Sequence, residues 1–104
     1  MEAHLEGKKF LCGDTLTLSD IRVFMTLIRY DEVYVVYFKT NTKQICEYPN
    51  IFRFCVEMWK IPEVKANINM NHIKVHYFTS HATLNAYAIV PKGPNFIGKM
   101  ESQI

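Results

Sequence analysis

The pattern of apolar and polar positions divides this chain into several helices. Residues 18–29 begin with a Thr17-Leu18-Ser19-Asp20 capping box, in which the first and fourth residues hydrogen-bond to each other's backbone amides. Apart from Asp20, the polar residues of this stretch share one narrow stripe of the helical wheel. A helix with so narrow a polar stripe is buried around most of its circumference. We therefore expect this helix in the middle of a bundle.

The segment 31–38, DEVYVVYF, carries conflicting signals. Its valines and tyrosines are typical of a strand. The chain offers no second strand to pair with it, however, and an isolated strand leaves its backbone groups unpaired. We predict that the segment continues the preceding helix in an irregular helical form.

Two further helices come next along the chain. Pro49 at a first helical position predicts a helix that runs to about Trp59 and is apolar on nearly every side. After a short helical turn from Pro62, a second helix begins at residue 70 with Asn69 as its N-cap. Its buried face is predicted from the spacing of Met70, Ile73 and Tyr77.

Regular structure is expected to end at Ser80, because Pro91, Gly93 and Pro94 interrupt the C-terminal tail. The tail is nevertheless too apolar for a solvated terminus, so we expect it to wrap back over the helices. Its apolar residues are Leu84, Tyr87, Ile89, Val90 and Phe96. A tyrosine on the helix beneath such a tail suits a polar point in an apolar pocket. From spacing alone, Tyr77 is more often a core tyrosine with a satisfied hydroxyl.

Composition narrows the class of protein. At 104 residues the chain is one domain or part of one, and its 49% hydrophobic content excludes a disordered tail. Two helices that are apolar most of the way round need more neighbours than the chain supplies, so we expect it to work against another domain or subunit. The net charge is only +2, and the twelve lysines and arginines are scattered along the chain, which argues against nucleic-acid binding. No run approaches eighteen apolar residues, so no membrane association is predicted.

The thiols and imidazoles predict neither a disulfide framework nor a metal site. Three cysteines without CxxC spacing favour a reducing compartment, which is the cytoplasm or another such compartment, a plastid included. Cys55 falls inside an apolar helical run, where a thiol is inert. His72 and His76 have a zinc-compatible spacing, with His81 nearby, but no glutamate follows His72 and no acidic group lies close in sequence.

Three stretches, in order, carry a family resemblance: FLCGDTLTLSDIRVFMTLIRYDEVYVVYFKTN, YPNIFRF and NHIKVHYFTSHATLNAYAIVPKGPNF. Over residues 10–96 the chain resembles the C-terminal helical half of the glutathionyl-hydroquinone reductases, which are xi-class, omega-like glutathione S-transferases. The resemblance implies an all-α fold, namely a partial glutathione S-transferase C-terminal bundle with a long irregular C-terminal tail. Residues 1–104 then form one incomplete domain, without its first helices and without the thioredoxin-like domain.

The resemblance also implies a function. In this family a thioredoxin-like domain binds the co-substrate glutathione and carries a catalytic cysteine, and the helical domain closes a hydroquinone pocket. Two tyrosines of the helical half point at the cysteine, and they match Tyr34 and Tyr77 here. Phenol groups that donate to a thiolate favour its charged form. Tyr34 and Tyr77 are therefore the expected catalytic and substrate-binding residues, and the full-length protein is expected to be a homodimer.

The chain departs from the family pattern in two respects. It has no cysteine domain, so we expect no turnover by this chain alone and a thioredoxin-like partner in cis or in trans. Where the family has Asn-Pro-x-Gly-Ile, the chain reads Asn85-Ala86-Tyr87-Ala88-Ile89, which changes the backbone options near the pocket. The alternative is a non-catalytic helical module that serves in dimerisation or as a scaffold.

Overall fold

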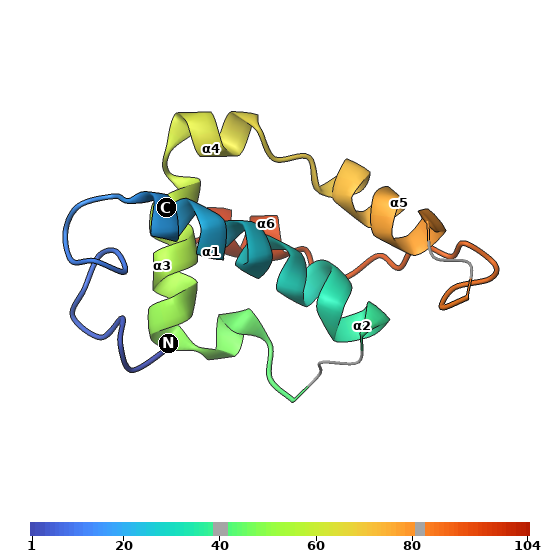
Figure 1. Cartoon of the computed structure of the whole chain (residues 1–104), viewed down its shortest axis with the longest axis horizontal. Coiled ribbons are helices and arrows are strands. Elements are labelled where there is room, and N and C mark those ends of the chain that lie inside the picture. The colour runs from blue at the N-terminus through green and yellow to red at the C-terminus, as the bar shows by residue number, and fades with distance from the viewer. Residues whose placement is uncertain (39–41, 81–82) are drawn as a thin grey trace.

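A computed structural model describes residues 1–38, 42–80 and 83–104, and within these ranges it contains helices and no β-strand. The expected all-α fold is confirmed. The elements, shown in Figure 1, are α1 (Leu18–Arg29), η1 (Tyr30–Tyr34), α2 (Val35–Tyr37), η2 (Ile45–Glu47), α3 (Pro49–Trp59), α4 (Pro62–Ala66), α5 (Met70–Ser80) and α6 (Phe96–Glu101).

The predicted capping box begins α1. The buried Asp20 carboxylate accepts the backbone N–H of Thr17 at 2.8 Å, and its other oxygen accepts that of Leu11, also at 2.8 Å. The two backbone donors satisfy the hydrogen-bonding capacity that burial would otherwise leave unused. Asp20 thus starts the helix and holds the preceding loop against it.

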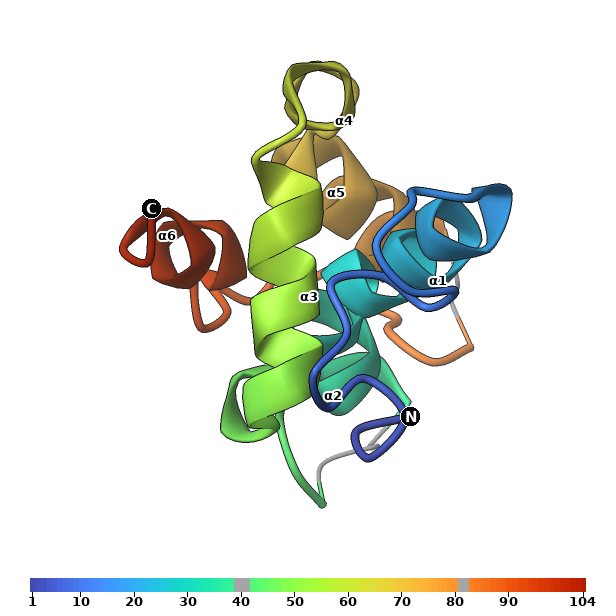
Figure 2. The same ribbon diagram turned by 90° about the vertical axis from the view of Figure 1, so that its left-hand side faces the viewer.

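Helix α3 is the centre of the bundle and lies between α1 and α6 (Figure 2). It begins at Pro49 and ends at Trp59, as predicted, and it buries six of its 11 residues. The main apolar core forms around it. That core comprises Leu5, Phe10, Phe24, Leu27, Ile28, Ile45, Ile51, Phe54, Cys55, Val56, Met58, Trp59, Phe96 and Met100.

The ambiguous segment after α1 is helical and irregular, which confirms the prediction. In η1 the N–H of Val35 donates to the carbonyl of Tyr30, five residues earlier, so this turn is a π-helix. One extra residue per turn rotates the following side chains relative to α1. Such single π-turns are frequent at functional sites.

The prediction that α1 is buried around most of its circumference is wrong for this chain. Leu18 is 62% exposed and Ile21 is 39% exposed, because no described element covers this side of α1. A hollow of about 320 Å³ lies beside Ile21, and Met25, Val64 and Ile68 give it an apolar lining. These residues form an apolar surface. The sequence led us to expect one, because its apolar helices need more neighbours than the chain supplies.

The tail returns towards α3 but is only partly buried. Phe96 is fully buried and begins α6, a helix that the sequence pattern did not predict. The expected burial of the tail's other large side chains is wrong, because no described element lies over them. They are Leu84 at 60%, Tyr87 at 88%, Ile89 at 65% and Val90 at 37% exposed.

Candidate functional site

Tyr34 of η1 and Tyr77 of α5 meet where η1 and α5 contact each other, at the end of the molecule that carries α2 and α5 (Figure 1). Their hydroxyl oxygens are 3.3 Å apart, and their rings cross edge to face with centroids 5.8 Å apart. Both side chains are half-buried. The structure thus brings together the two residues expected to form the site, and their catalytic role stays a prediction.

Local chemistry places each tyrosine. The π-turn of η1 buries Asp31, Glu32 and Val33 and leaves Tyr34 on the side that faces α5. Helix α5 begins where expected, because the Asn69 side chain accepts the backbone N–H of His72 at 3.1 Å. The buried residue of α5 is Phe78 rather than the predicted Met70, Ile73 and Tyr77, all of which are half-buried.

The surroundings of Tyr34 keep its hydroxyl protonated. Partial burial raises the pKa of Tyr34, and the hydrogen bond to Tyr77 and the charge of Tyr77 raise it further, while nearby Arg29 lowers it. A phenol that stays neutral remains a hydrogen-bond donor. Tyr34 can therefore donate to an anion without losing its proton to it.

Aromatic rings extend the wall around the two hydroxyls. Phe38 lies with its ring centroid 5.4 Å from that of Tyr34 and is 48% exposed. Tyr30 meets Tyr34 edge to face at 6.5 Å, and His76 meets Tyr77 in the same way at 5.3 Å. This wall offers flat apolar faces beside polar hydroxyls, a combination that suits an aromatic ligand with polar substituents.

A buried ion pair beside the tyrosines was not predicted. Lys74 of α5 lies with its Nζ 3.6 Å from Oε2 of Glu32, and both side chains are largely removed from solvent. Glu32 also accepts the backbone N–H of Phe96 at 2.7 Å. The sequence signal for it was present, because Asp31 and Glu32 are adjacent acids inside an otherwise apolar run.

The tail makes a tight turn against the C-terminal end of α5. The side-chain amide of Asn85 donates to the carbonyls of Phe78 and Ile89, at 2.7 and 2.8 Å. Within the same turn Ala88 has φ = +52°, a left-handed conformation that glycine adopts without strain. The resemblance noted in the sequence implies glycine at this position, so the departure at Ala88 falls where the backbone favours glycine.

Comparison with known proteins decides the family. The model described as "Glutathione S-transferase, C-terminal domain" matches residues 1–56, more than half of the chain. The chain belongs to this family.

The relatives of this glutathione S-transferase C-terminal domain include glutathionyl-hydroquinone reductases, which confirms the predicted resemblance. This chain is 44% identical to the glutathionyl-hydroquinone reductase PcpF of Sphingobium chlorophenolicum over 94 residues, which are 90% of this chain and 30% of PcpF. It is 38% identical to the glutathionyl-hydroquinone reductase YqjG of Escherichia coli, covering 90% of this chain and 29% of YqjG. The chain thus spans about 30% of the length of these relatives.

Solved structures agree. The glutathione-bound structure of YqjG matches with a TM-score of 0.86 at 39% identity, covering 89% of this chain and 30% of that one. The xi glutathione transferase of Phanerochaete chrysosporium matches with a TM-score of 0.87 at 46% identity, covering 90% and 31% of the two chains. The domain described here is therefore part of a glutathione S-transferase helical domain of the xi type.

The cysteines of this transferase domain differ in environment. Cys55 is fully buried in α3, and burial, with a smaller contribution from the charge of Asp31, raises the pKa of its thiol, so that it stays protonated. Cys12 is exposed, and Cys46 is half-buried with its Sγ 3.6 Å from Nζ of Lys99. The environment of Cys55 is that of an inert core thiol, as expected.

Within the described residues no three metal-ligating side chains gather, and no helix is long and apolar enough to cross a membrane. His72 and His76 are exposed on α5. His81, the third histidine considered from the sequence, lies outside the described residues.

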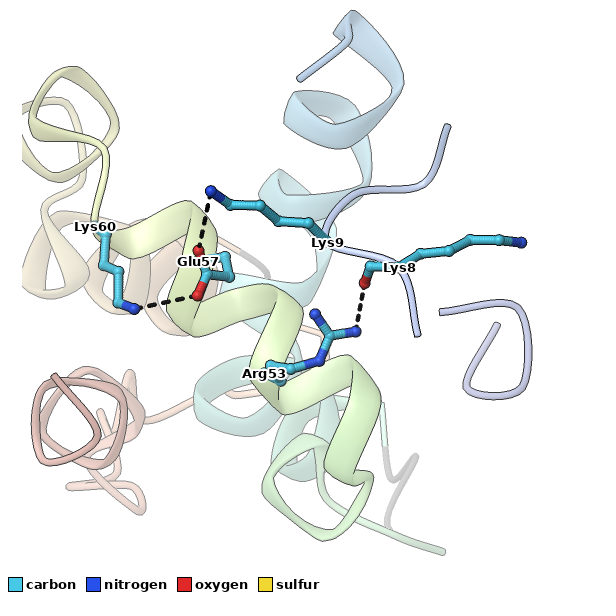
Figure 3. A network of polar contacts seen from close by, with 5 residues as sticks. All are labelled: Lys8, Lys9, Arg53, Glu57 and Lys60. Carbon is cyan, nitrogen blue, oxygen red and sulfur yellow. Dashed lines mark hydrogen bonds and ion pairs between the residues drawn. The ribbon is translucent and has the colours of Figure 1, made fainter. Parts of the chain in front are cut away.

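A second hollow, of about 370 Å³, lies along α3 beside Phe52 and Val56. Its polar side chains already have partners within the chain. Arg53 donates to the carbonyls of Leu5 and Lys8, and Glu57 pairs with Lys60 at 3.1 Å and with Lys9 at 3.8 Å; Figure 3 shows the Lys8 bond and both ion pairs. These contacts hold the N-terminal segment on α3, so we assign this network a structural role.

Proposed function

We propose that this domain forms the hydroquinone-side wall of a glutathionyl-hydroquinone reductase. In that reaction a cysteine thiolate from a thioredoxin-like domain attacks the sulfur of a glutathionyl-hydroquinone. The carbon–sulfur bond breaks, the hydroquinone carbon takes a proton, and a cysteine–glutathione disulfide forms. A second glutathione thiolate then attacks that disulfide, and oxidised glutathione and the cysteine thiolate leave.

The observation that carries this proposal is the contact between the hydroxyls of Tyr34 and Tyr77 in a half-buried aromatic wall. A hydrogen bond to a charged group contributes about 1.5–3 kcal/mol. Two such donors aimed at a sulfur anion would favour the thiolate over the thiol. A thiolate is the attacking form in the first step and a better leaving group in the second.

The same proposal assigns the other components. Glutathione is the co-substrate and binds mainly on the thioredoxin-like domain, which joins this domain in cis or in trans. The ligand of the aromatic wall is a hydroquinone-type small molecule. The full-length protein acts as a homodimer in the cytoplasm or another reducing compartment.

A chimera tests the proposal. The matching 94 residues of PcpF are replaced by those of this chain, and the rest of PcpF supplies the missing cysteine domain. Turnover of a glutathionyl-hydroquinone is then measured as a function of pH. In the chimera, Tyr34→Phe and Tyr77→Phe should each lower kcat/KM about 10-fold and raise the pKa of the reactive thiol by about one unit, the equivalent of about 1.4 kcal/mol.

Tyr87→Phe in the same chimera is the matched control, because Tyr87 is 88% exposed on the tail. It should leave both the rate and the pH profile unchanged. If Tyr34→Phe and Tyr77→Phe behave like Tyr87→Phe, the proposed role of the two phenols is wrong. Turnover by the 104-residue chain alone would show that a nucleophile lies within it.

The exposed side of α1 favours a second candidate, a non-catalytic helical interaction module. Leu18 and Ile21 are exposed there beside the apolar hollow over Val64 and Ile68. Such a module would self-associate through this side, and Ile21→Glu would abolish the association measured by analytical ultracentrifugation.

A further inference from the structure

The two tyrosines are carried by elements that share few contacts. Phe78 is the buried residue of α5 among those described, and its ring lies 4.9 Å from that of Tyr37. Phe78 also packs in a small cluster with Val33 of η1, and α5 meets η1 further through the hydroxyl contact of the tyrosines and the ion pair between Lys74 and Glu32. A helix with so few buried side chains depends on each of these contacts for its position.

The ion pair and the hydroxyl contact both join η1 to α5. Glu32 is two residues before Tyr34 in η1, and Lys74 is three residues before Tyr77 in α5. Residues three apart in a helix are neighbours on one face, so Lys74 and Tyr77 share a face of α5, whereas Glu32 and Tyr34, two apart, do not share one in η1. The contact between residues 32 and 74 is therefore a second link between η1 and α5, separate from the hydroxyls, and it limits how far the two elements can move apart.

The surroundings strengthen the attraction between Glu32 and Lys74. The side chains of Lys74 and Glu32 are 13% and 3% exposed, so little solvent screens their charges. Oε2 of Glu32 accepts no hydrogen bond from the described residues, and Lys74 is its cationic neighbour. A buried carboxylate needs such a cation, because a buried charge without a partner is strongly unfavourable.

The tail closes over the same pair. Lys74 donates to the carbonyl of Lys92, and Glu32 accepts the N–H of Phe96. Gly93, which lies between Lys92 and Phe96 in the tail, has φ = +76°. A Cβ at this position would lie 2.0 Å from Oε2 of Glu32. Only glycine allows the backbone to approach the carboxylate this closely.

We infer that Glu32 and Lys74 are positioning residues that set the spacing between the Tyr34 and Tyr77 hydroxyls. The pair fixes α5 against η1, and the tail at Gly93 holds the pair in place. That these phenols act on a thiolate rests on the proposed function, whereas their spacing can be measured without any thiol.

The test uses 3-fluorotyrosine in the 104-residue chain and reads the fluorine resonances of residues 34 and 77 by NMR. Tyr34→Phe and Tyr77→Phe assign the two resonances. Because the hydroxyls are in contact, Tyr34→Phe should also shift the resonance of residue 77. The size of this shift measures the coupling between the phenols.

Lys74→Met keeps most of the side chain and removes the charge, and it should reduce the coupling more than twofold. Lys74→Arg should restore it. Lys65→Met is the matched control, because it breaks the exposed pair of Lys65 with Glu101, 3.9 Å apart, and should leave the coupling unchanged. Equal coupling in Lys74→Met and Lys65→Met would overturn the inference.

Lys74→Met leaves a buried carboxylate without its cation and can unfold the chain. The double variant Glu32→Gln/Lys74→Met avoids this, since the side-chain carbonyl of the new amide would still accept the N–H of Phe96 and no charge stays buried. We expect it to keep its helical circular dichroism and to lose the coupling more than twofold. Unchanged coupling in the folded double variant would refute the inference, whereas loss of the chimera's thiol effect alone would refute only the proposed function.

Discussion

Helices α3 and α5 have the same length, 11 residues each, and opposite surroundings. Helix α3 buries six residues at the centre of the core, whereas α5 buries only Phe78 among its described residues. Helix α3 is held by apolar packing on several sides, whereas α5 is held by one small apolar cluster around Phe78, a hydroxyl contact and an ion pair. The comparison separates the part of the domain that supplies stability from the part that carries the candidate chemistry.

The largest effect is expected in α3. Phe54 is fully buried, so Phe54→Ala should lower the free energy of unfolding by about 3–5 kcal/mol. Val75 of α5 is 42% exposed, and Val75→Ala should change it by no more than about 0.5 kcal/mol. Urea unfolding followed by circular dichroism measures both. Similar losses in the two variants would remove the contrast between the helices.

A smaller and local effect is expected from Phe78→Ala. This ring is 2% exposed and packs in a small cluster with Val33 and Tyr37, so its loss should cost about 3 kcal/mol, felt mainly as release of α5. Hydrogen exchange should accelerate at the amides of residues 70–80 while those of α3 stay protected. Equal acceleration in both helices would mean that α5 and α3 unfold together.

Local signals in the sequence predicted the stable half of the molecule well. The capping box at Thr17 and the proline at position 49 fix helix starts through chemistry within a few residues, and both helices begin where expected. The irregular helix after α1 also followed from a local argument, the lack of a strand partner. Such features depend on neighbours in sequence, so the sequence alone is sufficient.

The site was less accessible to such reasoning. The spacing of α5 favoured a core role for Tyr77, and only the family resemblance paired it with Tyr34. The ion pair joins residues 42 positions apart: the adjacent acids of η1 mark one partner, but no pattern in α5 identifies Lys74 as the other. Helix α6 is six residues long and starts from a left-handed Asn95, so it is too short to show periodicity.

Asp31 and Glu32 are adjacent in η1 but contact different parts of the domain. Glu32 pairs with Lys74 of α5, whereas Asp31 contacts the core around α3. Asp31 accepts the N–H of Ile45, at the core side, at 2.7 Å. Burial raises the pKa of Asp31, although the amides of Ile45 and Cys46 and the charge of Lys99 oppose this. A raised pKa means that the folded state holds the proton more tightly, so this residue's stabilising contribution is lost as pH rises through the folded-state value.

Asp31→Asn removes the ionisable group, so the variant does not lose this stabilisation as pH rises. The side-chain carbonyl of the amide can still accept the N–H of Ile45. The free energy of unfolding of the variant, relative to the natural sequence, should therefore increase as pH rises from the ordinary aspartate range through the raised pKa, and stay constant above it. Thermal unfolding across this pH range gives the difference. A difference independent of pH would show that Asp31 titrates normally.

The smallest expected effect lies in the tail beyond α5. Ala88 has φ = +52°, which costs an alanine about 1 kcal/mol relative to glycine, and glycine gives back part of this gain through its greater freedom when unfolded. Ala88→Gly should therefore raise the free energy of unfolding by up to about 1 kcal/mol. Ala86 lies in the same turn without a positive φ, so Ala86→Gly should be neutral or destabilising. Chemical unfolding of the two variants tests this directly: if both behave alike, the tail does not make this turn in solution, and the contact of Asn85 with the end of α5 would be in question as well.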